Sequence, residues 1–455
     1  MFNQYKIIHF VGIGGIGMSG IAEVLHNLGY EITGSDLRES DITSRLRKLG
    51  IKIFIGHDEK NIEAAHVVVT SSAVSSSNPE VTAAKDRGVP VIPRAEMLAE
   101  LGRLKYGILV AGAHGKTTTT SLIATLLGEG GLDPTVVIGG KLKAFGSNAR
   151  LGQGEFLVAE ADESDGSFLK LSPAIAIITN IDREHMDYFK DIDTLKAAFL
   201  SFINKVPFYG VAIVCKENEH TREILPQIKR RVLTYGLSHD ADMYARNIRF
   251  GESGMIFEAV FKGNLLGEFR VPILGVHNVL NSLAAILTAM QLQMPQDKIK
   301  VGLGGFGGIQ RRFEFRGQSR SIKVYDDYGH HPVEIRAVLK AARECFPDNR
   351  IVVIFQPHRY TRTRDLMNDF ALSFGSVDRL YLLDIYAASE TPINGVDSAA
   401  LLRKIQEVGL LKAEYINDRD ELIKSLLSDL KNGDIVITLG AGDVYKIGEE
   451  LLKAL

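Results

Sequence analysis

The sequence YGILVAGAHGKTTTT, residues 106–120, joins an apolar stretch to a glycine turn and a run of hydroxyl residues. An uninterrupted apolar run of this length is typical of a strand buried on both faces of a parallel sheet. The turn Gly112-x-x-Gly115-Lys116-Thr117 is a shortened form of the phosphate loop GxxxxGK[ST], whose backbone N–H groups surround a phosphate. We therefore expect a strand, a nucleoside triphosphate loop and a helix at the start of an α/β domain.

Oxygen ligands for a metal ion follow two later apolar runs. In a parallel sheet, ligands gather at the carboxyl ends of the strands, so both segments should face the phosphate loop. Lys116 is expected to meet the outer phosphates and Thr117 to place its hydroxyl on Mg²⁺ or Mn²⁺, which prefer oxygen donors. The acid-rich segments contribute Glu160, Asp162, Glu163 and Asp165 after the first run, and Asp182, Glu184, His185 and Asp187 after the second.

Another glycine turn, GIGGIG at residues 12–17, directly follows the first apolar run of the chain. Glycines let a backbone approach a diphosphate closely, and the start of the following helix offers N–H groups. Asp36, at the end of the next run, is the kind of residue that holds a ribose hydroxyl in NAD-binding domains. A UDP-sugar needs the same backbone geometry, and the hydroxyls of Ser71 and Ser72 would add donors. From these residues alone, NAD and a UDP-sugar both remain open.

The alternation of short apolar runs with helical stretches occurs in three cycles. A new cycle begins at Tyr106 and again near Ser321. Between Met255 and Val271, two alternating strands around Lys262-Gly263-Asn264 predict an antiparallel hairpin at one edge. We predict an α/β fold of three domains. They are a Rossmann-like UDP-binding domain over residues 1–105, a central P-loop ATPase-like domain over 106–320 with a mostly parallel sheet and an antiparallel edge, and a Rossmann-like C-terminal domain over 321–455.

Composition excludes several classes of function. The 53 Lys and Arg against 55 Asp and Glu give a formal charge of -2, so we expect neither nucleic acid nor a membrane surface as a partner. The apolar runs fall far short of the ~18 residues of a membrane span. Two distant cysteines, Cys215 and Cys345, offer no disulfide framework, and no basic segment precedes the first apolar run as in a signal peptide. These features predict a cytoplasmic protein.

Further motifs extend along the chain: HNVLNSLAA at 277–285, QRRFE at 310–314, DDYGHHP at 326–332, FQPHRYTR at 355–362 and LGAGD at 439–443. Together with the glycine turns and the segments EADESD and TNIDREHMD, they resemble the Mur ligase family along essentially the whole chain. The resemblance implies a bacterial cytoplasmic enzyme that uses ATP and Mg²⁺ (or Mn²⁺) to attach L-alanine to UDP-N-acetylmuramate in peptidoglycan precursor synthesis. It implies a three-domain arrangement in which these domains bind UDP, ATP and the amino acid in turn.

The resemblance also implies roles for matching positions. Lys116, Glu160 and His185 would be catalytic, and Thr117, Glu160 and His185 would hold the metal. ATP would be bound by Gly112, Ala113, His114, Gly115, Lys116, Thr117, Thr118, Asn281, Arg312 and Asp327. Among these, Asn281 would contact the adenine and Asp327 the ribose. The UDP-sugar would be bound by Gly14, Gly15, Ile16, Gly17, Asp36, Ser71 and Ser72, and the substrate carboxylates by His358 and Arg359.

Two positions depart from the family pattern. Ala113 stands where relatives usually carry a hydroxyl residue, so one side-chain contact to phosphate is in doubt while the backbone contacts are not. Phe199 stands where several ligases that act later in the pathway carry a carbamylated lysine. We therefore expect that no such modification is used here.

Other functions stay open on the sequence alone. The nearest is a ligase that attaches a recycled peptide to the same UDP-sugar. An NAD-dependent dehydrogenase would account for the first glycine turn, but it leaves Lys116, Thr117 and both acid-rich segments unexplained. A binding protein gated by a nucleotide, without turnover, is a third alternative.

Overall fold

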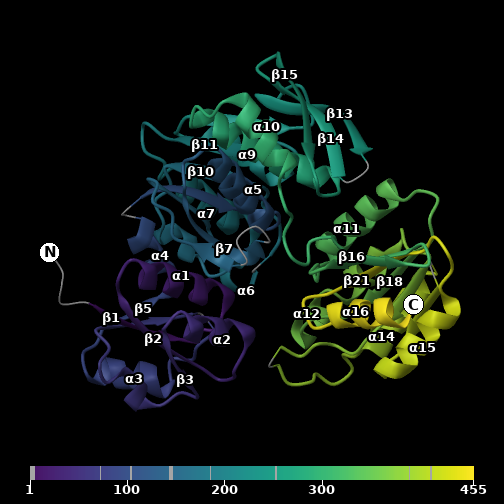
Figure 1. Cartoon of the computed structure of the whole chain (residues 1–455), viewed down its shortest axis with the longest axis horizontal. Helices are drawn as coiled ribbons and strands as arrows, with labels where there is room; N and C mark the ends of the chain where they lie inside the picture. Colours follow the sequence, from purple (N-terminus) through teal and green to yellow (C-terminus); the bar gives the residue numbers. More distant parts are fainter. Residues whose placement is uncertain are drawn as a thin grey trace. The chain divides into compact units, whose positions relative to one another are not determined.

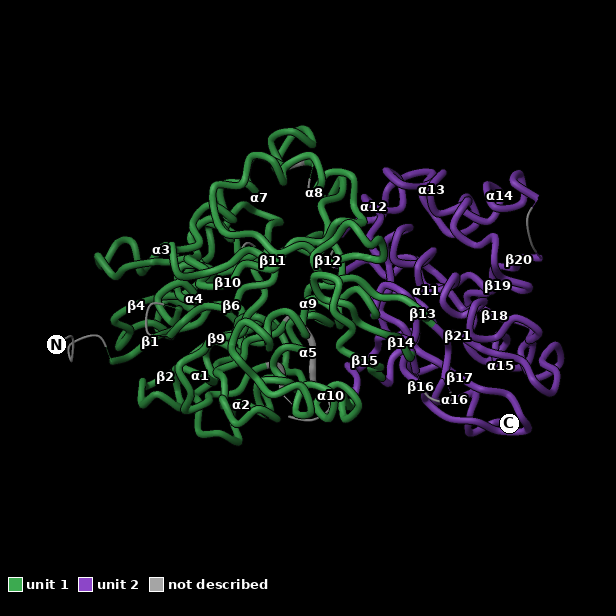
Figure 2. Tube along the Cα trace, turned by 90° about the horizontal axis from the view of Figure 1, so that it is seen from above, with its two compact units in different colours: residues 1–248, 256–271, 279–307 green, residues 249–255, 272–278, 308–455 purple. Residues whose placement is uncertain are grey.

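The computed structural model describes residues 6–71, 73–102, 105–142, 147–184, 186–251, 254–388, 390–409 and 412–455. The chain divides into two compact units, coloured separately in Figure 2. Unit 1 comprises residues 1–248, 256–271 and 279–307, and unit 2 comprises residues 249–255, 272–278 and 308–455. The three-domain division at residues 105 and 320 stays a prediction.

The first sheet of unit 1 has five parallel strands in the order β3-β2-β1-β4-β5. Figure 1 labels β1, β2, β3 and β5 of this sheet. Its strands are β1 (Ile7–Val11), β2 (Glu31–Asp36), β3 (Lys52–Ile55), β4 (Val67–Thr70) and β5 (Val91–Pro93), with helices α1 (Ile16–Asn27), α2 (Asp41–Lys48), α3 (Pro79–Asp86) and α4 (Arg94–Gly102). The strand order reverses between β1 and β4, which is where open α/β sheets bind ligands. The turn of residues 12–17 follows β1, and Ser71 follows β4.

The second sheet has ten strands in the order β15-β14-β13-β12-β11-β10-β6-β9-β7-β8. Its strands are β6 (Tyr106–Ala111), β7 (Thr135–Leu142), β8 (Ser147–Arg150), β9 (Phe156–Glu160), β10 (Ile175–Ile178), β11 (Val211–Cys215), β12 (Val232–Gly236), β13 (Met243–Gly251), β14 (Gly254–Phe261) and β15 (Asn264–Val271). The central strand β6 pairs in parallel with β10 on one side and β9 on the other. The loop after β6 therefore emerges between the two acid-rich segments.

Helices of this part are α5 (Lys116–Glu129), α6 (Met186–Phe189), α7 (Ile192–Ile203), α8 (Glu219–Ile224), α9 (Val276–Gln291) and α10 (Gln296–Gly304). The predicted hairpin is present as β14 and β15, which are neighbours in the sheet. Its turn residues Lys262 and Gly263 both have positive φ, of 48° and 80°, as a type I′ turn requires. Phe199 in α7 is buried and packs edge-on against Phe168, so it belongs to the hydrophobic core.

The sheet of unit 2 has the order β16-β17-β21-β18-β19-β20, in which β16 is antiparallel and the others are parallel. The strands are β16 (Glu314–Ser319), β17 (Ile322–Asp327), β18 (Ile351–Phe355), β19 (Arg379–Leu382), β20 (Lys412–Tyr415) and β21 (Ile435–Leu439). The helices are α11 (Pro332–Cys345), α12 (Tyr360–Asp365), α13 (Met367–Ala371), α14 (Ser398–Val408), α15 (Arg419–Asp429) and α16 (Tyr445–Ala454). Short 3₁₀ turns lie at Glu59–Ile62, Ser167–Lys170, Leu225–Gln227 and Leu372–Phe374.

Alternate residues of β18 face two separate cores, as expected for a central strand covered on both sides. Val353 and Phe355 belong to the core that includes Ile335 of α11, whereas Val352 and Ile354 belong to the other, with helices α15 and α16. The sheet is thereby fixed from both faces, and the loops at its strand ends carry the polar residues. Within the described ranges, no helix is both long and apolar enough to cross a membrane. Both cysteines are buried and free.

Candidate active site

The loop between β6 and α5 has a backbone that only glycine fits at two positions. Gly112 has φ of +139°, and a Cβ there would lie 2.1 Å from Oγ1 of Thr179. Gly115 has φ of +82°, and a Cβ there would lie 2.8 Å from Oδ1 of Asn281. No side chain caps the start of α5. Its first N–H groups are therefore the kind of donors that bind phosphate at a helix N-terminus.

The end of β10 fixes the shape of this loop. The Thr179 hydroxyl and the Asn180 amide both donate to the carbonyl of His114, at 2.6 and 2.9 Å. Asn180 in turn accepts from the His114 N–H at 2.8 Å, and its own carbonyl accepts from the N–H of Ala113 at 3.3 Å. The Thr-Asn pair of the second acid-rich segment thus supports the loop and is a contribution that we did not predict.

Lys116 is held by a carboxylate from the first acid-rich segment. Its Nζ donates to Oε1 and Oε2 of Glu163 at 2.8 and 3.0 Å, and to the carbonyl of Gly112 at 2.5 Å. Burial by itself lowers the pKa of Lys116, but the negative charges of Glu163, Asp162 and Glu160 raise the pKa above its ordinary value. A charged ammonium is therefore kept at the loop, and Glu163 is its ion-pair partner.

Oxygen donors suited to a divalent cation lie close to this ammonium. Thr117 follows Lys116 in the first turn of α5, and Glu160 ends β9 opposite Val110 of β6. A hydroxyl and a carboxylate at this position fit Mg²⁺, which takes few protein oxygens and keeps phosphate and water oxygens as its other ligands. The third predicted ligand, His185, lies outside the described residues, and so does Ser72.

The second acid-rich segment faces the imidazole of the loop. Nε2 of His114 lies 3.5 Å from a carboxylate oxygen of Asp182 and 3.6 Å from one of Glu184. On the other side of the loop, Oγ1 of Thr119 donates to Oδ1 of Asn281 at 3.1 Å, while the predicted ATP residue Thr118 is buried. The contact of Asn281 with adenine stays a prediction, because what is observed is its packing against the phosphate loop.

The turn of residues 12–17 is built differently. The N–H groups of Gly12 and Ile13 donate to the carbonyl of Ser35, at 2.8 and 3.0 Å. The N–H of Gly14 donates to Oδ2 of Asp36 at 2.8 Å, and a Cβ on Gly14 would lie 2.7 Å from that same oxygen. Asp36 therefore shapes the turn directly. No side chain caps α1 at Gly15, so its first N–H groups form a second place for phosphate.

Two further predicted residues flank this turn. Ile16, the first residue of α1, is 42% exposed. The hydroxyl of Ser71 lies 4.0 Å from the position of a Cβ on Gly12. The roles of these residues toward a UDP-sugar stay predictions.

Arg94 connects the first turn with the acid-rich segment beside the second. Its Nη1 lies 3.2 Å from the position of a Cβ on Gly17, and its Nη2 donates to Oδ2 of Asp162 at 3.2 Å. We did not predict Arg94 from the sequence. Its position in the sequence could have indicated it, because Arg94 directly follows β5 and therefore lies at the carboxyl edge of the first sheet.

In unit 2, the two adjacent arginines of QRRFE differ in their contacts. Arg311 donates from Nε to Asp326 at 2.8 Å, and from its two terminal nitrogens to the carbonyls of Gly442 and Gly440 at 2.9 and 2.6 Å. These bonds hold the guanidinium of Arg311 within unit 2. Arg312 is about one-third exposed, with Glu334 at 3.7 Å.

Asp327 is buried with both of its oxygens accepting backbone hydrogen bonds. The donors are the N–H groups of Phe313 and Gly329, at 2.7 and 2.6 Å. Burial raises the pKa of Asp327 to about 6, against the lowering influence of Arg312 and of these two N–H groups. Its predicted role toward the ribose of ATP is not tested by these contacts.

His358 and Arg359 follow β18. The His358 ring stacks on Tyr386, and its Nδ1 lies 3.1 Å from Nη1 of Arg362. Because a guanidinium only donates, Nδ1 accepts and the ring proton is on Nε2. Burial, with the nearby positive charges, lowers the pKa of His358 to about 4, so the ring is neutral at pH 7. Arg359 is exposed and has φ of +72°, a strained backbone of the kind found at functional sites.

Comparison with known proteins finds three family models that follow one another along the chain. The model described as Mur ligase family, catalytic domain, matches residues 7–106. Mur ligase middle domain matches residues 110–289, and Mur ligase, glutamate ligase domain, matches residues 311–442.

Curated relatives match over their full length. A UDP-N-acetylmuramate–L-alanine ligase of Trichlorobacter lovleyi is 57% identical over 456 residues, covering 100% of both chains. One of Geotalea uraniireducens is 56% identical, covering 100% of this chain and 99% of the relative.

Solved structures of similar proteins cover almost the same span. The UDP-N-acetylmuramate–alanine ligase of Thermotoga maritima matches with a TM-score of 0.84 at 29% identity, over 98% of each chain. A murein peptide ligase of Psychrobacter arcticus matches with a TM-score of 0.73 at 25% identity, over 99% of this chain and 98% of the other.

Proposed function

The chain belongs to the Mur ligase family, and on that premise we propose that it uses ATP to join L-alanine to the lactyl carboxylate of UDP-N-acetylmuramate, in peptidoglycan precursor synthesis. The observation that carries the proposal is the lysine-bearing phosphate loop, held by Glu163 and Asn180, in a chain that matches L-alanine ligases from end to end. The matched segments 7–106, 110–289 and 311–442 are assigned to UDP-sugar, ATP and amino acid, in that order. The proposed compartment is the cytoplasm, which contains ATP.

The chemistry explains why a phosphate loop is needed for an amide bond. A carboxylate repels an incoming amine and has no good leaving group. Transfer of the γ-phosphoryl group from ATP to a carboxylate oxygen releases ADP and gives an acyl phosphate. The amine nitrogen of L-alanine then attacks the acyl carbon, a proton leaves the nitrogen, and inorganic phosphate departs with the C–O bond electrons.

Each residue of the loop has a part in the first of these steps. The N–H groups of Ala113 and His114 donate to Asn180, so those of Gly115 and Lys116 at the start of α5 would orient the phosphates. The ammonium of Lys116 would neutralise charge on the transferred group. When bound, Mg²⁺ (or Mn²⁺), held by Thr117, Glu160 and His185, supplies further charge neutralisation at the phosphate oxygens. His114 lies beside the carboxylates of Asp182 and Glu184. In the proposed complex it would lie close to the β- and γ-phosphates of ATP.

The turn of residues 12–17 would hold the diphosphate of the UDP-sugar through Gly14–Gly17 and Ser71. Asp36 keeps the turn in shape by accepting from Gly14. In unit 2, His358 would donate from Nε2 and Arg359 would supply positive charge, so the pair suits the carboxylate of the amino acid. Asn281, Arg312 and Asp327 are assigned to the adenosine part of ATP by the family resemblance.

A coupled assay of ADP release tests the function. Purified chain receives UDP-N-acetylmuramate, ATP and Mg²⁺ with L-alanine, with each other amino acid, or with a tripeptide. We expect ADP release that requires both the UDP-sugar and L-alanine. ADP release with the tripeptide alone would favour the recycling ligase, a function suggested by the name of the Psychrobacter arcticus structure. Reduction of NAD by hydride transfer, without release of ADP, would contradict the proposed ligase activity.

A further inference from the structure

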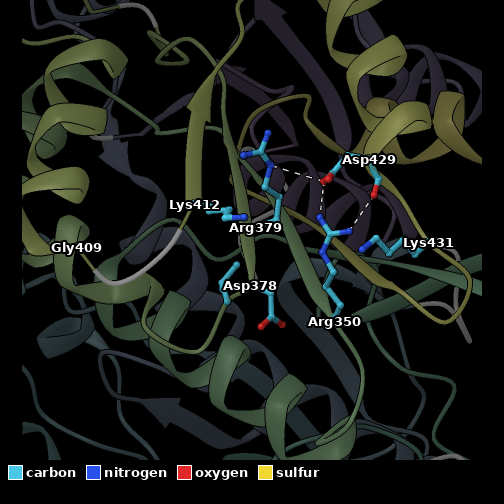
Figure 3. Close-up of a pocket in the computed structure, with 8 residues that line it drawn as sticks. Arg350, Asp378, Arg379, Gly409, Lys412, Asp429 and Lys431 are labelled. Atoms are coloured by element: carbon cyan, nitrogen blue, oxygen red, sulfur yellow. Dashed lines mark hydrogen bonds and ion pairs between the residues drawn. The ribbon is translucent and has the colours of Figure 1, made fainter.

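A cavity in unit 2 lies away from the residues assigned above. It has a volume of about 760 Å³ and is lined by Arg350, Val377, Asp378, Arg379, Gly409, Lys412, Asp429 and Lys431 (Figure 3). Arg350 precedes β18, while Arg379 and Lys412 are the first residues of β19 and β20. The cavity is therefore at the amino ends of the parallel strands. His358 follows the other end of β18, a strand of five residues that spans about 16 Å.

The two arginines of the cavity are held rigidly by Asp429. Arg350 donates from Nη1 to the main-chain carbonyl of Asp429 at 2.9 Å and from Nη2 to its carboxylate. Nε of Arg379 lies 3.6 Å from the same carboxylate, and its Nη2 donates to Glu414. Figure 3 shows the carboxylate of Asp429 between the two guanidiniums. Nη1 of Arg350 also lies 3.4 Å from Oδ2 of Asp434. These contacts pre-orient both planar groups.

Asp378, the other acid of the lining, points away from Arg379 and already accepts two hydrogen bonds. The carboxylate of Asp378 accepts from Nη2 of Arg343 at 2.6 Å and from the N–H of Ile351 at 2.8 Å. In Figure 3 it points away from Arg379 and Asp429. Asp378 therefore leaves the positive charge inside the cavity in place.

Lys412 and Lys431 supply positive charge outside these ion pairs. Among the residues that the structure describes, neither ammonium group takes part in an ion pair. With Arg350 and Arg379 they make four cationic side chains at the cavity, where the carboxylates of Asp429, Asp434 and Glu414 pair with the two arginines. An anion that bridges the two lysines and reaches the guanidinium N–H groups would gain from all four side chains.

The lining also indicates which kind of anion fits. Among the described lining residues, Val377 and Gly409 are the apolar ones and none is aromatic, so these residues offer no aromatic stacking surface to a base or sugar ring. Fixed guanidiniums beside mobile ammonium groups match the tetrahedral oxygens of phosphate. We propose that this cavity binds a compact polyphosphate anion, with Lys412 and Lys431 as its principal contacts and Arg350 and Arg379 as the rigid floor.

The test uses tripolyphosphate as the probe and the full chain as the protein. Calorimetric titration is made on the Lys116→Ala variant in the presence of UDP and without Mg²⁺, which weakens the competing phosphate loop and fills the first turn. The test variant adds Lys412→Ser and Lys431→Ser. The matched control adds Lys404→Ser and Lys424→Ser, two exposed lysines of α14 and α15 outside the cavity.

We expect the Lys412/Lys431 pair of substitutions to weaken tripolyphosphate binding by about tenfold or more, and the control pair by less than about twofold. Equal weakening by both pairs, or no saturable binding in the Lys116→Ala chain, would overturn the proposal. Citrate bound as tightly as tripolyphosphate, with the same dependence on the two lysines, would overturn the assignment to phosphate. These outcomes do not depend on ligase turnover.

A second measurement needs no substitution. Acetylation of the unaltered chain is followed by mass spectrometry with and without tripolyphosphate. Protection of Lys412 and Lys431, with Lys404 and Lys424 acetylated at unchanged rates, supports the site. Unchanged acetylation of all four lysines would contradict it.

Discussion

The two glycine turns of unit 1 have similar backbones and differ in the charged side chain that lies nearest to each. Each follows the central strand of a sheet and opens a helix that no side chain caps. At the first turn the nearest charged partner is an acid, Asp36, which accepts from Gly14. At the second turn it is a base, Lys116, which is held by Glu163.

This difference separates holding a phosphate from reacting with one. In the proposed function, backbone N–H groups would bind phosphate at both turns, and Asp36 keeps the first turn in shape by accepting from Gly14. At the second turn the partly buried ammonium of Lys116 would add a full positive charge where negative charge moves during phosphoryl transfer. We therefore assign the UDP-sugar, which is only held, to the first turn, and ATP, which reacts, to the second. Each prediction below tests that contrast.

The largest effect should come from removing the ammonium. Lys116→Ala is expected to lower the rate of ADP formation by at least about 10²–10³-fold, because it removes charge stabilisation of the transferred phosphoryl group. Calorimetry should find binding of UDP-N-acetylmuramate unchanged. Lys170→Ala, an exposed lysine of the same unit, is the matched control and should retain full turnover. A variant at Lys116 that still releases ADP at the normal rate contradicts the contrast.

A smaller loss is expected from Gly115→Ala. Its new Cβ would lie 2.8 Å from Oδ1 of Asn281 at a φ of +82°, so the loop must move as well as accept strain. We expect the KM for ATP to rise about ten- to a hundredfold, from a strain of about 1–3 kcal/mol. Gly131→Ala is the control, because its φ of +77° is similar but nothing lies within 4 Å. If both variants raise the KM for ATP equally, the loop contact is not responsible.

Gly14→Ala should have a milder effect, confined to the other substrate. The new Cβ would lie 2.7 Å from Oδ2 of Asp36, a flexible side chain that can turn away at the cost of its bond to the Gly14 N–H. We expect the KM for UDP-N-acetylmuramate to rise about tenfold, since one charge-assisted hydrogen bond is lost. The KM for ATP should not change, and Gly304→Ala, with open space around it, should alter neither value. A shift in the KM for ATP would show that the turns are not independent.

The smallest effect concerns pH. Because the carboxylates raise the pKa of Lys116 above its ordinary value of 10.5, the ammonium stays charged well into alkaline conditions. Its stabilising interaction is complete below the ordinary pKa and is lost only as the pH passes the raised one. ADP affinity measured by calorimetry should therefore be flat between about pH 7 and 9. In Glu163→Gln the decline should begin at lower pH, and a decline below pH 9 in the unaltered chain would contradict the ion pair.

The parts that the sequence could predict are those with strong local chemistry. Gly112, Gly115 and Lys116 lie at fixed spacing after an apolar run, and both acid-rich segments follow buried strands, so their meeting at one edge of a parallel sheet follows from topology. The hairpin turn at Lys262-Gly263 is likewise a local signal.

Edge strands and the choice between neighbouring charges could not be predicted. The strands β16 and β20 lie at sheet edges and are rich in polar residues, so they lack the apolar run that identifies a central strand. Spacing does not reveal that Glu163 contacts Lys116 whereas Asp162 contacts Arg94. Spacing also does not reveal that Arg311, and not Arg312, donates to Asp326 and to two main-chain carbonyls. These outcomes depend on side-chain directions that only the assembled fold determines.

The carboxylate of Glu163 acts as an internal counter-ion for the loop. While no nucleotide is present, the buried ammonium already has an anion beside it, so any arriving phosphate must exchange one ion pair for another or share the cation. A singly charged anion gains little from such an exchange. A triphosphate brings several charges and several hydrogen bonds at once, and the resting chain is thereby selective against the abundant small anions around it.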